Sequence, residues 1–361
     1  MHDLVVIGGG PAGTATAILC ARKGARVLLL ERGRFPRHKV CGEFVSAESL
    51  GLLAELFGGE SRGLLRDAIE IPEARIFLDG RVLQTLIEPA AVSIARLDLD
   101  AALWKAAERN GVETKQQATV QRIEGTGPFV VIGTRGSHEA RSVVNASGRW
   151  SNLTAEPTNG RSKWIGLKAH FAECAPPASV DLYFFDGGYC GIQPVSLAGC
   201  ADEHRVNACA MVRADVASTI TEILALHPAL RERAQTWKAL SDPVSVGPLL
   251  FRKPRPVADG MLRVGDAAAF VDPFVGDGIS LALRSGVLAA ECLIEFFAGN
   301  GDPRETERRY AVRYERQLAP VFRASSRLRR MLMLPRAVRA PILFVLENTP
   351  VITRQLVRRT R

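Results

Sequence analysis

The stretch FPRHKVCGEF, residues 35–44, places one cysteine between a basic cluster and a Gly-Glu pair. Cys41 could be a buried space-filler, a redox thiol, a metal ligand or part of the wall around a reactive group. A chemical role as a thiolate requires nearby cations, which Arg37, His38 and Lys39 could provide. The seven cysteines of the chain are scattered without a CxxC pair, which argues against a zinc site, a disulfide framework and a disulfide relay. The role of Cys41 therefore depends on what binds just upstream.

The segment upstream of Cys41 predicts a strand, a glycine turn, a helix and a second strand. Leu4–Ile7 is an apolar run typical of a buried parallel strand. An alanine-rich helical segment follows as far as Lys23, and Gly24 closes it. Val27–Leu30 is the second expected strand, and Glu31 ends it. This order of elements is typical of a nucleotide-binding unit.

Three glycines between the first strand and the helix have the spacing G-x-G-x-x-G. Gly8 allows the tight turn, Gly10 lets a pyrophosphate approach the backbone, and Gly13 permits close packing of helix on strand. The helix N-terminus then faces the phosphates, and Glu31 can accept hydrogen bonds from a ribose diol. These residues predict a dinucleotide site, but they do not separate FAD from NAD.

A second glycine-rich unit lies near the other end of the chain, at residues 261–293. It begins with an expected strand, Met261–Val264, followed by a Gly-Asp pair and an irregular stretch that runs through Pro273. Gly276 and Gly278 then precede a long helix rich in small residues. From the residues alone, this unit is another strand, turn and helix.

Together these motifs resemble those of the FAD-dependent geranylgeranyl reductase and aromatic hydroxylase (group A flavin monooxygenase) superfamily. The chain is identified as a member, since the resemblance covers most of its length, with specific motifs near residues 3–43, 93–151 and 261–286. The resemblance implies an α/β fold, in which a Rossmann-like FAD-binding domain carries an inserted β-sheet substrate domain and C-terminal helices.

The resemblance also implies where non-covalent FAD binds. Asp266 contacts the ribityl chain, and Gly276–Ile279 meets the pyrimidine edge of the flavin, where a helix N-terminus stabilises negative charge. The segment after the second strand crosses the flavin, so that Arg37 touches the cofactor, Cys41 lines the cavity and Gly42 allows close approach. The other cofactor contacts expected are Glu31, Arg32, Arg96, Val120, Gly265, Pro273, Gly276, Gly278 and Ile279.

The expected domains alternate along the chain. Residues 1–68, 93–156 and 254–300 are assigned to the FAD-binding domain, residues 69–92 and 157–253 to the β-sheet substrate domain, and residues 301–361 to C-terminal basic helices. The substrate sheet is predicted from strand-like runs within residues 69–87 and 163–213, which are separated by turn-rich stretches. In the related folds such a sheet roofs the flavin and holds the substrate.

The expected catalytic residues are Cys41, His170, Tyr189 and Gln193. Cys41 belongs to a K-x-C-G motif of the reductase branch, and we favour a packing role for it over a chemical one. Lys168 and His170 share one face of an expected strand, where His170 is either a base or a satisfied structural residue. Tyr189 and Gln193 are candidate polar guides in an apolar pocket. No metal site is expected.

The resemblance leaves several activities open. A monooxygenase that hydroxylates an aromatic or polyketide-like hydrophobic substrate through a flavin hydroperoxide is favoured. The alternative is a reductase or dehydrogenase that moves hydride to an unsaturated, prenyl-like substrate. Residues 187–195 lack the tryptophan of the reductase pattern and the tryptophan pair of flavin-dependent halogenases, so a halogenase is less favoured, as is a non-catalytic flavoprotein. Ser147 replaces an aspartate linked to NADPH use in the hydroxylases, so NADPH, NADH or a separate reductase could supply electrons.

The net charge of +9 is concentrated in the C-terminal tail. From residue 323 onward the chain has ten arginines against Glu347 alone, which makes the remainder neutral overall and gives no reason to expect nucleic acid binding. This tail either packs on the FAD domain or forms a basic surface that meets an anionic membrane or an acidic carrier protein. The N-terminus has no signal-peptide pattern and no apolar run is long enough to span a membrane. A cytoplasmic protein, with peripheral membrane contact in the second case, is expected.

Overall fold

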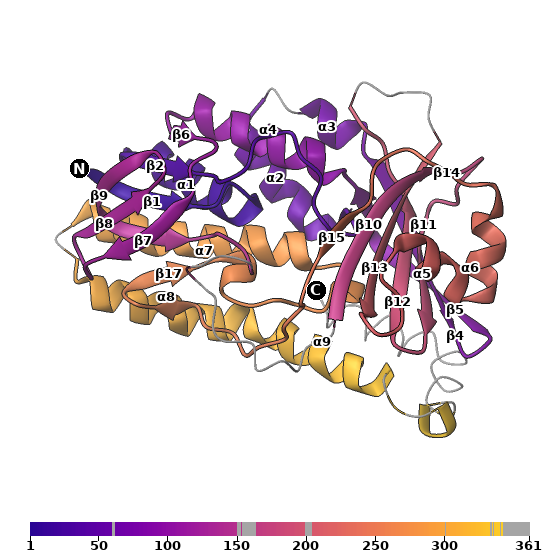
Figure 1. Cartoon of the computed structure of the whole chain (residues 1–361). Coiled ribbons are helices and arrows are strands. Elements are labelled where there is room, and N and C mark those ends of the chain that lie inside the picture. The colour runs from indigo at the N-terminus through magenta and orange to yellow at the C-terminus, as the bar shows by residue number, and fades with distance from the viewer. Residues whose placement is uncertain are drawn as a thin grey trace.

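The chain builds two β-sheets that stand side by side, with long helices along one flank of the first (Figure 1). This computed structural model describes residues 1–59, 62–149, 153, 164–198, 204–299, 301–332, 334, 336–339 and 341. The first sheet lies at the end of the molecule where the N-terminus is, and the second sheet stands at the other end.

The first sheet has a parallel core in the order β17-β9-β1-β2-β6, with β16 antiparallel at its edge. Its central strands are apolar runs buried on both faces, as parallel sheets require. The hairpin β7–β8 pairs with β9 through β8 and covers one face of the sheet. The core between the hairpin and the sheet includes Val5, Leu28 and Val131. The strands are β1 (His2–Ile7), β2 (Val27–Leu30), β6 (Glu113–Lys115), β7 (Val120–Glu124), β8 (Phe129–Gly133), β9 (Gly136–Asn145), β16 (Val257–Ala258) and β17 (Met261–Arg263).

Helices cover the other face of the first sheet, and the small residues predicted for two of them explain how closely they pack. A Cβ on Gly286 of α7 would lie 2.3 Å from the carbonyl oxygen of Ala12 on α1. The Thr16 hydroxyl donates to the Gly286 carbonyl at 3.0 Å. The helices are α1 (Pro11–Arg22), α2 (Leu50–Phe57), α3 (Arg62–Arg66), α4 (Arg96–Arg109), α7 (Gly278–Ala298), α8 (Pro303–Gln317) and α9 (Ala319–Leu332).

The second sheet follows the order β14-β10-β13-β12-β11-β4-β5-β3, with β15 also paired to β10. The predicted strands of residues 69–87 and 163–213 therefore join one layer, as expected. Its strands are β3 (Phe44–Val45), β4 (Ile69–Leu78), β5 (Arg81–Ser93), β10 (Trp164–Ala172), β11 (Ser179–Phe185), β12 (Gly188–Pro194), β13 (Arg205–Arg213), β14 (Lys238–Ala239) and β15 (Val244–Val246).

Side chains alternate cleanly between the two faces of this sheet. Leu167, Ala169 and Ala208 pack into a core closed by α5 (Ile220–Leu226) and α6 (Pro228–Arg233). The register places Lys168 opposite Cys209 and His170 opposite Asn207, all on the other face. The prediction that Lys168 and His170 share a face is confirmed, and Asn207 lies on the same face.

The C-terminal helices link the two sheets. Helix α9 extends from beneath the first sheet toward the second (Figure 1). Beyond it, the Arg339 guanidinium donates to both carboxylate oxygens of Asp79 at 2.6 Å, at the turn between β4 and β5. Arginines on the described part of the tail therefore contact the protein itself. Residues 342–361, which carry the rest of the predicted basic surface, lie outside the described residues.

Candidate functional site

The glycine turn after β1 forms the cradle predicted for a pyrophosphate. Gly8 has φ +111°, and a Cβ there would lie 2.2 Å from the carbonyl oxygen of Ala146. A Cβ on Gly13 would lie 1.9 Å from the Gly8 carbonyl oxygen, so both positions require glycine. Gly10 is the N-cap of α1, whose first backbone N–H groups have no partner within the helix. This arrangement fits the phosphates of a dinucleotide.

Glu31 holds the same turn in place through hydrogen bonds to its backbone. Its buried carboxylate accepts hydrogen bonds from the backbone N–H groups of Gly9 at 2.9 Å and Gly33 at 2.7 Å. Arg37 donates to it at 2.8 Å and stacks over Phe35. Glu31 thus shapes the turn, which sequence reasoning had not considered, while its predicted contact with a ribose stays a prediction.

Lys39 brings a cation close to the glycine turn. Its Nζ lies 3.9 Å from the Cβ position of Gly10. Burial is the largest influence on the pKa of Lys39 and lowers it. The sequence analysis assigned the cofactor contact in this segment to Arg37 instead. A lysine two residues farther along the same extended segment is an equally strong sequence signal, and the fold brings Lys39 to the phosphate loop.

Asp266 occupies the turn after β17, where the ribityl chain is expected. Its carboxylate lies 3.1 Å from the guanidinium of Arg149, which stacks over the Phe270 ring at 3.7 Å. About a third of the Asp266 side chain is exposed, so its oxygens remain open to a ligand. Gly265, with φ +57°, makes the turn beside Ala12 possible.

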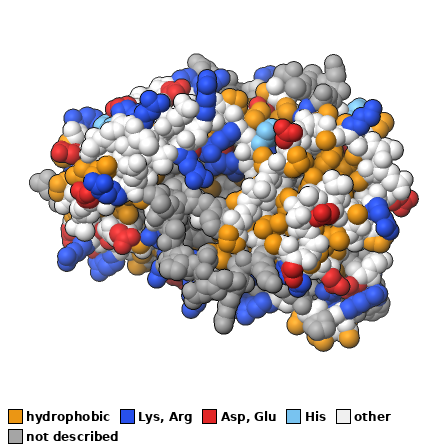
Figure 2. Space-filling view, viewed as in Figure 1, with side chains coloured by type: hydrophobic (Ala, Val, Ile, Leu, Met, Phe, Trp, Pro, Cys, Tyr) orange, Lys and Arg blue, Asp and Glu red, His pale blue; other side chains and the backbone are white. Residues whose placement is uncertain are grey.

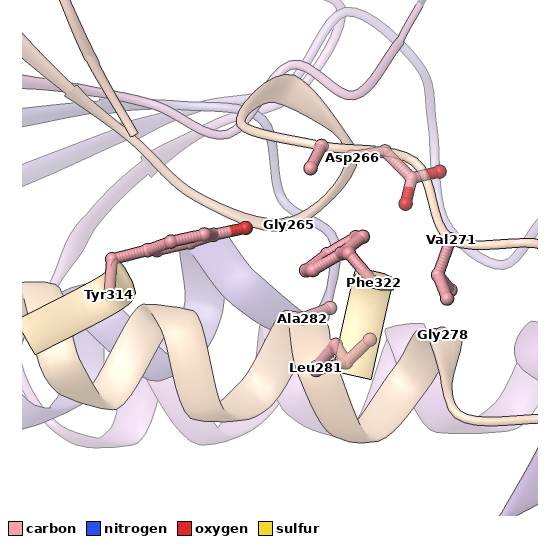
Figure 3. A pocket seen from close by; sticks show the side chains of 9 residues that line it. Gly265, Asp266, Val271, Gly278, Leu281, Ala282, Tyr314 and Phe322 are labelled. Atoms are coloured by element: carbon pink, nitrogen blue, oxygen red, sulfur yellow. The ribbon is translucent and has the colours of Figure 1, made fainter. Parts of the chain in front are cut away.

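A small pocket lies beneath this turn. Figure 3 shows Tyr314 of α8 and Phe322 of α9 between the Gly265–Asp266 turn and the first turns of α7. Its walls are apolar apart from Asp266 and the Tyr314 hydroxyl. The residues that line it are Gly265, Asp266, Ala269, Val271, Gly278, Leu281, Ala282, Tyr314 and Phe322.

The loop before α7 packs directly on the segment that contains Cys41. Gly276 has φ +77°, and a Cβ on it would lie 2.9 Å from the ring of Phe44. Pro273 begins a 3-10 turn, and Gly278 is the first residue of α7. Ile279 is buried in the core, so only its backbone N–H group can contact a ligand. The two segments predicted to meet the flavin therefore adjoin each other.

Cys41 is partly buried at the edge of the FAD-domain core. Its Sγ accepts the backbone N–H of Glu43 at 3.3 Å, and its carbonyl accepts the Asn207 side-chain amide at 3.0 Å. Apart from its chain neighbours, no heavy atom of the described residues lies within 4 Å of a Cβ built on Gly42. This space leaves room for the close approach predicted at Gly42.

The remaining predicted cofactor residues have varied surroundings. Arg96 begins α4 and pairs with Asp100 through two hydrogen bonds of 2.8 Å. Arg32 is exposed after β2. Val120 begins β7 and packs in the core of the first sheet, so its side chain points into protein rather than toward a free surface. Any contact of Val120 with a cofactor would involve its backbone.

The three predicted catalytic residues of the second sheet lie on one face but bind different partners. The His170 Nε2 atom lies 2.8 Å from Glu43. The Gln193 side-chain amide donates to the Ser93 hydroxyl at 2.7 Å. The Tyr189 hydroxyl donates to Asp272 at 3.4 Å. Two buried carboxylates, Glu43 and Asp272, therefore contact this face, and Gln193 pairs with the buried hydroxyl of Ser93.

The group at Asp272 lies among aromatic rings. The Tyr189 ring contacts Phe184 and Phe274, with centroids 5.4 and 5.9 Å away. Asp272 is 3% exposed, and burial raises its pKa to about 7, against the opposing effect of Arg329. Arg329 of α9 approaches the Asp272 carboxylate at 3.5 Å. An apolar enclosure with one carboxyl group that titrates near neutral pH is typical of a ligand site.

Sequence reasoning missed Glu43 and Asp272, although both adjoin motifs that it identified. Glu43 directly follows the K-x-C-G motif, and Asp272 precedes the predicted Pro273 turn. The available signal was an acidic residue directly beside each motif. No cluster of three metal-ligating side chains occurs among the described residues.

On the face seen in Figure 2, basic side chains gather in the middle, between the regions of the two sheets. Hydrophobic side chains gather over the second sheet. A cofactor with two phosphates and an apolar substrate suit such a division. No helix in the described part of the chain is long and apolar enough to cross a bilayer.

Comparison with known proteins identifies the family. The FAD binding domain family matches residues 1–316, so the chain belongs to this family of FAD-dependent oxidoreductases, and FAD is its cofactor. The chain is 27% identical over 326 residues to the 1H-pyrrole-2-carbonyl-(peptidyl-carrier protein) brominase of Pseudoalteromonas luteoviolacea, covering 83% of this chain and 79% of that protein. It is 29% identical over 355 residues to digeranylgeranylglycerophospholipid reductase 2 of Methanopyrus kandleri, covering 89% and 84%.

Two further proteins are similar to this chain. The structure of the flavin-dependent brominase Bmp2 superposes with a TM-score of 0.81 at 22% identity, covering 99% of this chain and 93% of that chain, which supports the fold. Conditioned medium factor receptor 1 of Dictyostelium discoideum is 24% identical over 357 residues. The match covers 86% of this chain but only 66% of that longer protein.

Proposed function

We propose that this FAD-dependent oxidoreductase is a monooxygenase that hydroxylates a hydrophobic phenol. The observation that supports this proposal is the hydrogen bond from the phenolic hydroxyl of Tyr189 to the buried carboxyl group of Asp272, at 3.4 Å. Aromatic rings surround the Tyr189 side of this pair. A phenolic substrate would bring a second hydroxyl of the same kind to the same acceptor. Its ring would pack against Phe184 and Phe274.

The chemistry of a phenol explains why this carboxyl group matters. Electrophilic oxygen attacks an electron-rich ring, and a phenol becomes more electron-rich as it loses its proton. With a pKa raised to about 7 by burial, Asp272 can accept that proton near neutral pH. Tyr189 and Gln193 orient the substrate, and the surrounding rings exclude water. When bound, FAD supplies the redox chemistry, and NADPH, NADH or a separate reductase reduces it.

A reductase is the second candidate, and the segment around Cys41 favours it. Cys41 follows Lys39 in the K-x-C-G motif, and the loop is held against the substrate sheet through Glu43 and Asn207. The similarity to the Methanopyrus kandleri reductase gives the same indication. In this case Cys41 and His170 would line the path of an unsaturated substrate to the cofactor.

One experiment separates the candidates. The holoenzyme would be reduced anaerobically and then given a hydrophobic phenol, first without oxygen and then with ¹⁸O₂. Incorporation of one ¹⁸O atom into the product supports the monooxygenase. Reoxidation of the enzyme by an unsaturated, prenyl-like compound without oxygen would replace it with the reductase. A brominated product formed only when bromide is added would contradict both.

A further inference from the structure

We propose that His170, held in place by Glu43, carries protons between solvent and the cavity at Cys41, with His38 as its partner on the solvent side. The inference goes beyond the proposed function and does not depend on it. A monooxygenase and a reductase both exchange protons with solvent whenever the bound cofactor changes its redox state.

Glu43 is a positioning residue at the meeting point of three segments. Its side chain is fully buried, and its backbone has φ +64°, which is unusual for a glutamate. One carboxylate oxygen accepts the backbone N–H of Arg96 at 2.8 Å and also accepts Lys168 Nζ. The other oxygen accepts His170 Nε2 at 2.8 Å. This fixed partner determines which nitrogen of His170 remains available.

Lys168 keeps the Glu43 carboxylate ionised. Burial opposes the charge of Glu43, but Lys168 and His170 beside it lower the pKa of Glu43 to about 2. Glu43 therefore stays deprotonated across the physiological range and does not take the proton of His170. An ionised carboxylate bound to one imidazole nitrogen holds the ring in one orientation.

Two buried side-chain atoms on neighbouring strands, one of them the second ring nitrogen of His170, have no partner within the described part of the chain. Among the described residues, neither His170 Nδ1 nor Asn207 Oδ1 has a hydrogen-bond partner. The two residues are directly paired across β10 and β13, and both are at least 99% buried. Since Asn207 donates to the Cys41 carbonyl, this position adjoins the expected cavity. A water molecule that donates to Asn207 Oδ1 and bonds His170 Nδ1 would satisfy both atoms.

His38 connects this position with the surface. Its ring meets the His170 ring edge-on, with centroids 5.4 Å apart, and it is only partly buried. Burial lowers the pKa of His38, and the positive charges of Lys168 and His170 lower it further. The charged and titratable groups around the two rings are Glu43, Asp98, Lys168 and Arg205.

The proposed step moves one proton and no electrons. The N–H bond at Nδ1 of the His170 imidazolium breaks as the bound water accepts the proton on the cavity side. Neutral His170 remains hydrogen-bonded to Glu43 through Nε2–H. Water on the side of the His38 ring, which exchanges with solvent, then returns a proton to Nδ1, and the reverse sequence carries a proton outward.

Two variants separate a carrier from a structural residue. His170→Gln places an amide nitrogen near the position of Nε2, so it keeps the donor to Glu43 but cannot titrate. His227→Gln is the matched control. His227 is also partly buried and has a ring nitrogen, Nδ1, without a hydrogen-bond partner among the residues that the structure describes. It lies on the opposite face of the second sheet, against Phe77 and Tyr183. Dithionite-reduced holoenzyme would be mixed with oxygen at pH 5 to 9, and its reoxidation followed by flavin absorbance.

We expect reoxidation of the wild type and of His227→Gln to vary with pH. We expect His170→Gln to be slower by about a hundredfold and nearly independent of pH, the loss typical of a missing proton carrier. A wild-type rate and pH profile in His170→Gln would overturn the proposal.

Nuclear magnetic resonance of ¹⁵N-histidine holoprotein tests the same claim without turnover. At high pH we expect His170 to carry its proton on Nε2, and to gain a second at Nδ1 as the pH falls. His38→Gln should shift that titration, because it removes the neighbouring ring. A His170 signal that does not change between pH 5 and 9 would overturn the proposal even if the His170 variant failed to fold.

Discussion

The Tyr189 hydroxyl on β12 donates to the Asp272 carboxylate on the loop before α7, at 3.4 Å. This hydrogen bond joins the second sheet to the segment that is predicted to meet the flavin. It also places the carboxyl group in a setting where ionisation is costly, because burial raises its pKa to about 7.

Asp272→Asn should change how stability depends on pH. A carboxyl group with a raised pKa binds its proton more tightly in the folded state, so the free energy of unfolding falls as pH rises from about 4 to about 7. The asparagine variant removes this contribution, which amounts to at most about 4 kcal/mol. Urea unfolding at pH 5 and pH 8 measures it, with exposed Asp259→Asn as the control. If the free energy of unfolding changes between pH 5 and pH 8 by the same amount in Asp272→Asn and in the wild type, burial does not raise the pKa of Asp272.

Glu43→Gln should act in the opposite pH direction. The lowered pKa of Glu43 means that its ionised form stabilises the fold above pH 4.5, and that this contribution is lost as pH falls from 4.5 to about 2. At pH 7 the variant leaves buried Lys168 without its counter-charge, which typically costs about 3–5 kcal/mol. Chemical denaturation of Glu43→Gln and of the exposed control Glu124→Gln compares the two. Equal stability of both variants would show that Glu43 is not the hub of this cluster.

Asp266→Ala should weaken FAD binding more than it changes the fold. Its partly exposed carboxylate can accept hydrogen bonds from ribityl hydroxyls, and their loss should cost about 2 kcal/mol, more than tenfold in affinity. Titration of the apoprotein with FAD, followed by fluorescence, measures this change. Asp215→Ala, which removes an exposed aspartate paired with Arg213, should bind FAD like the wild type. Equal affinity in Asp266→Ala would mean that the ribityl chain binds elsewhere.

Cys41→Ala should keep FAD and retain turnover within a few-fold, because the thiol is bound by the Glu43 backbone at 3.3 Å and by the Arg96 guanidinium, and Arg96 keeps its pairing with Asp100 when the thiol is removed. Steady-state turnover with the phenol that incorporates ¹⁸O provides the measurement, and Cys41→Ser is the matched polar variant. A collapse of turnover in both, with FAD still bound, would make the thiol a chemical group rather than a wall.

The arginine-rich tail should give reversible, salt-sensitive binding to anionic vesicles. Each arginine near an anionic lipid surface contributes about 1 kcal/mol, and salt screens the attraction. Co-sedimentation with anionic and neutral vesicles, at low and high salt, measures the binding. A chain that ends at residue 341 should bind much more weakly, because it lacks four of the ten arginines and Arg339, which it keeps, is paired with Asp79. Negligible binding to both vesicles would leave packing or an acidic protein partner as the role of the tail.

The local elements were predictable because their signals are local. Apolar runs and glycine spacing predicted β1, α1 and β2, and the structure places Val27–Leu30 as a strand with these same bounds. Alternation along β10 predicted that Lys168 and His170 share a face. Each of these inferences uses residues within one element, where the backbone geometry alone relates side chains to each other.

The polar centres were not predictable, because they depend on contacts between distant segments. Glu43 meets Lys168 across 125 residues of sequence and His170 across 127. Asp272 meets Tyr189 across 83 residues. Neither carboxylate has a periodic pattern around it, and only the packing of the two sheets brings each to its partners.

The chain passes from the first sheet to the second and back twice, since β3–β5 and β10–β15 belong to the second sheet. This interleaving limits how specificity can be exchanged among relatives. A crossover that transfers β10–β15 alone would join a foreign half-sheet to the resident β4 along the β4–β11 ladder. A working chimera must inherit both stretches together, so we expect homologous recombination within this family to succeed at the ends of the second sheet and to fail between its two parts.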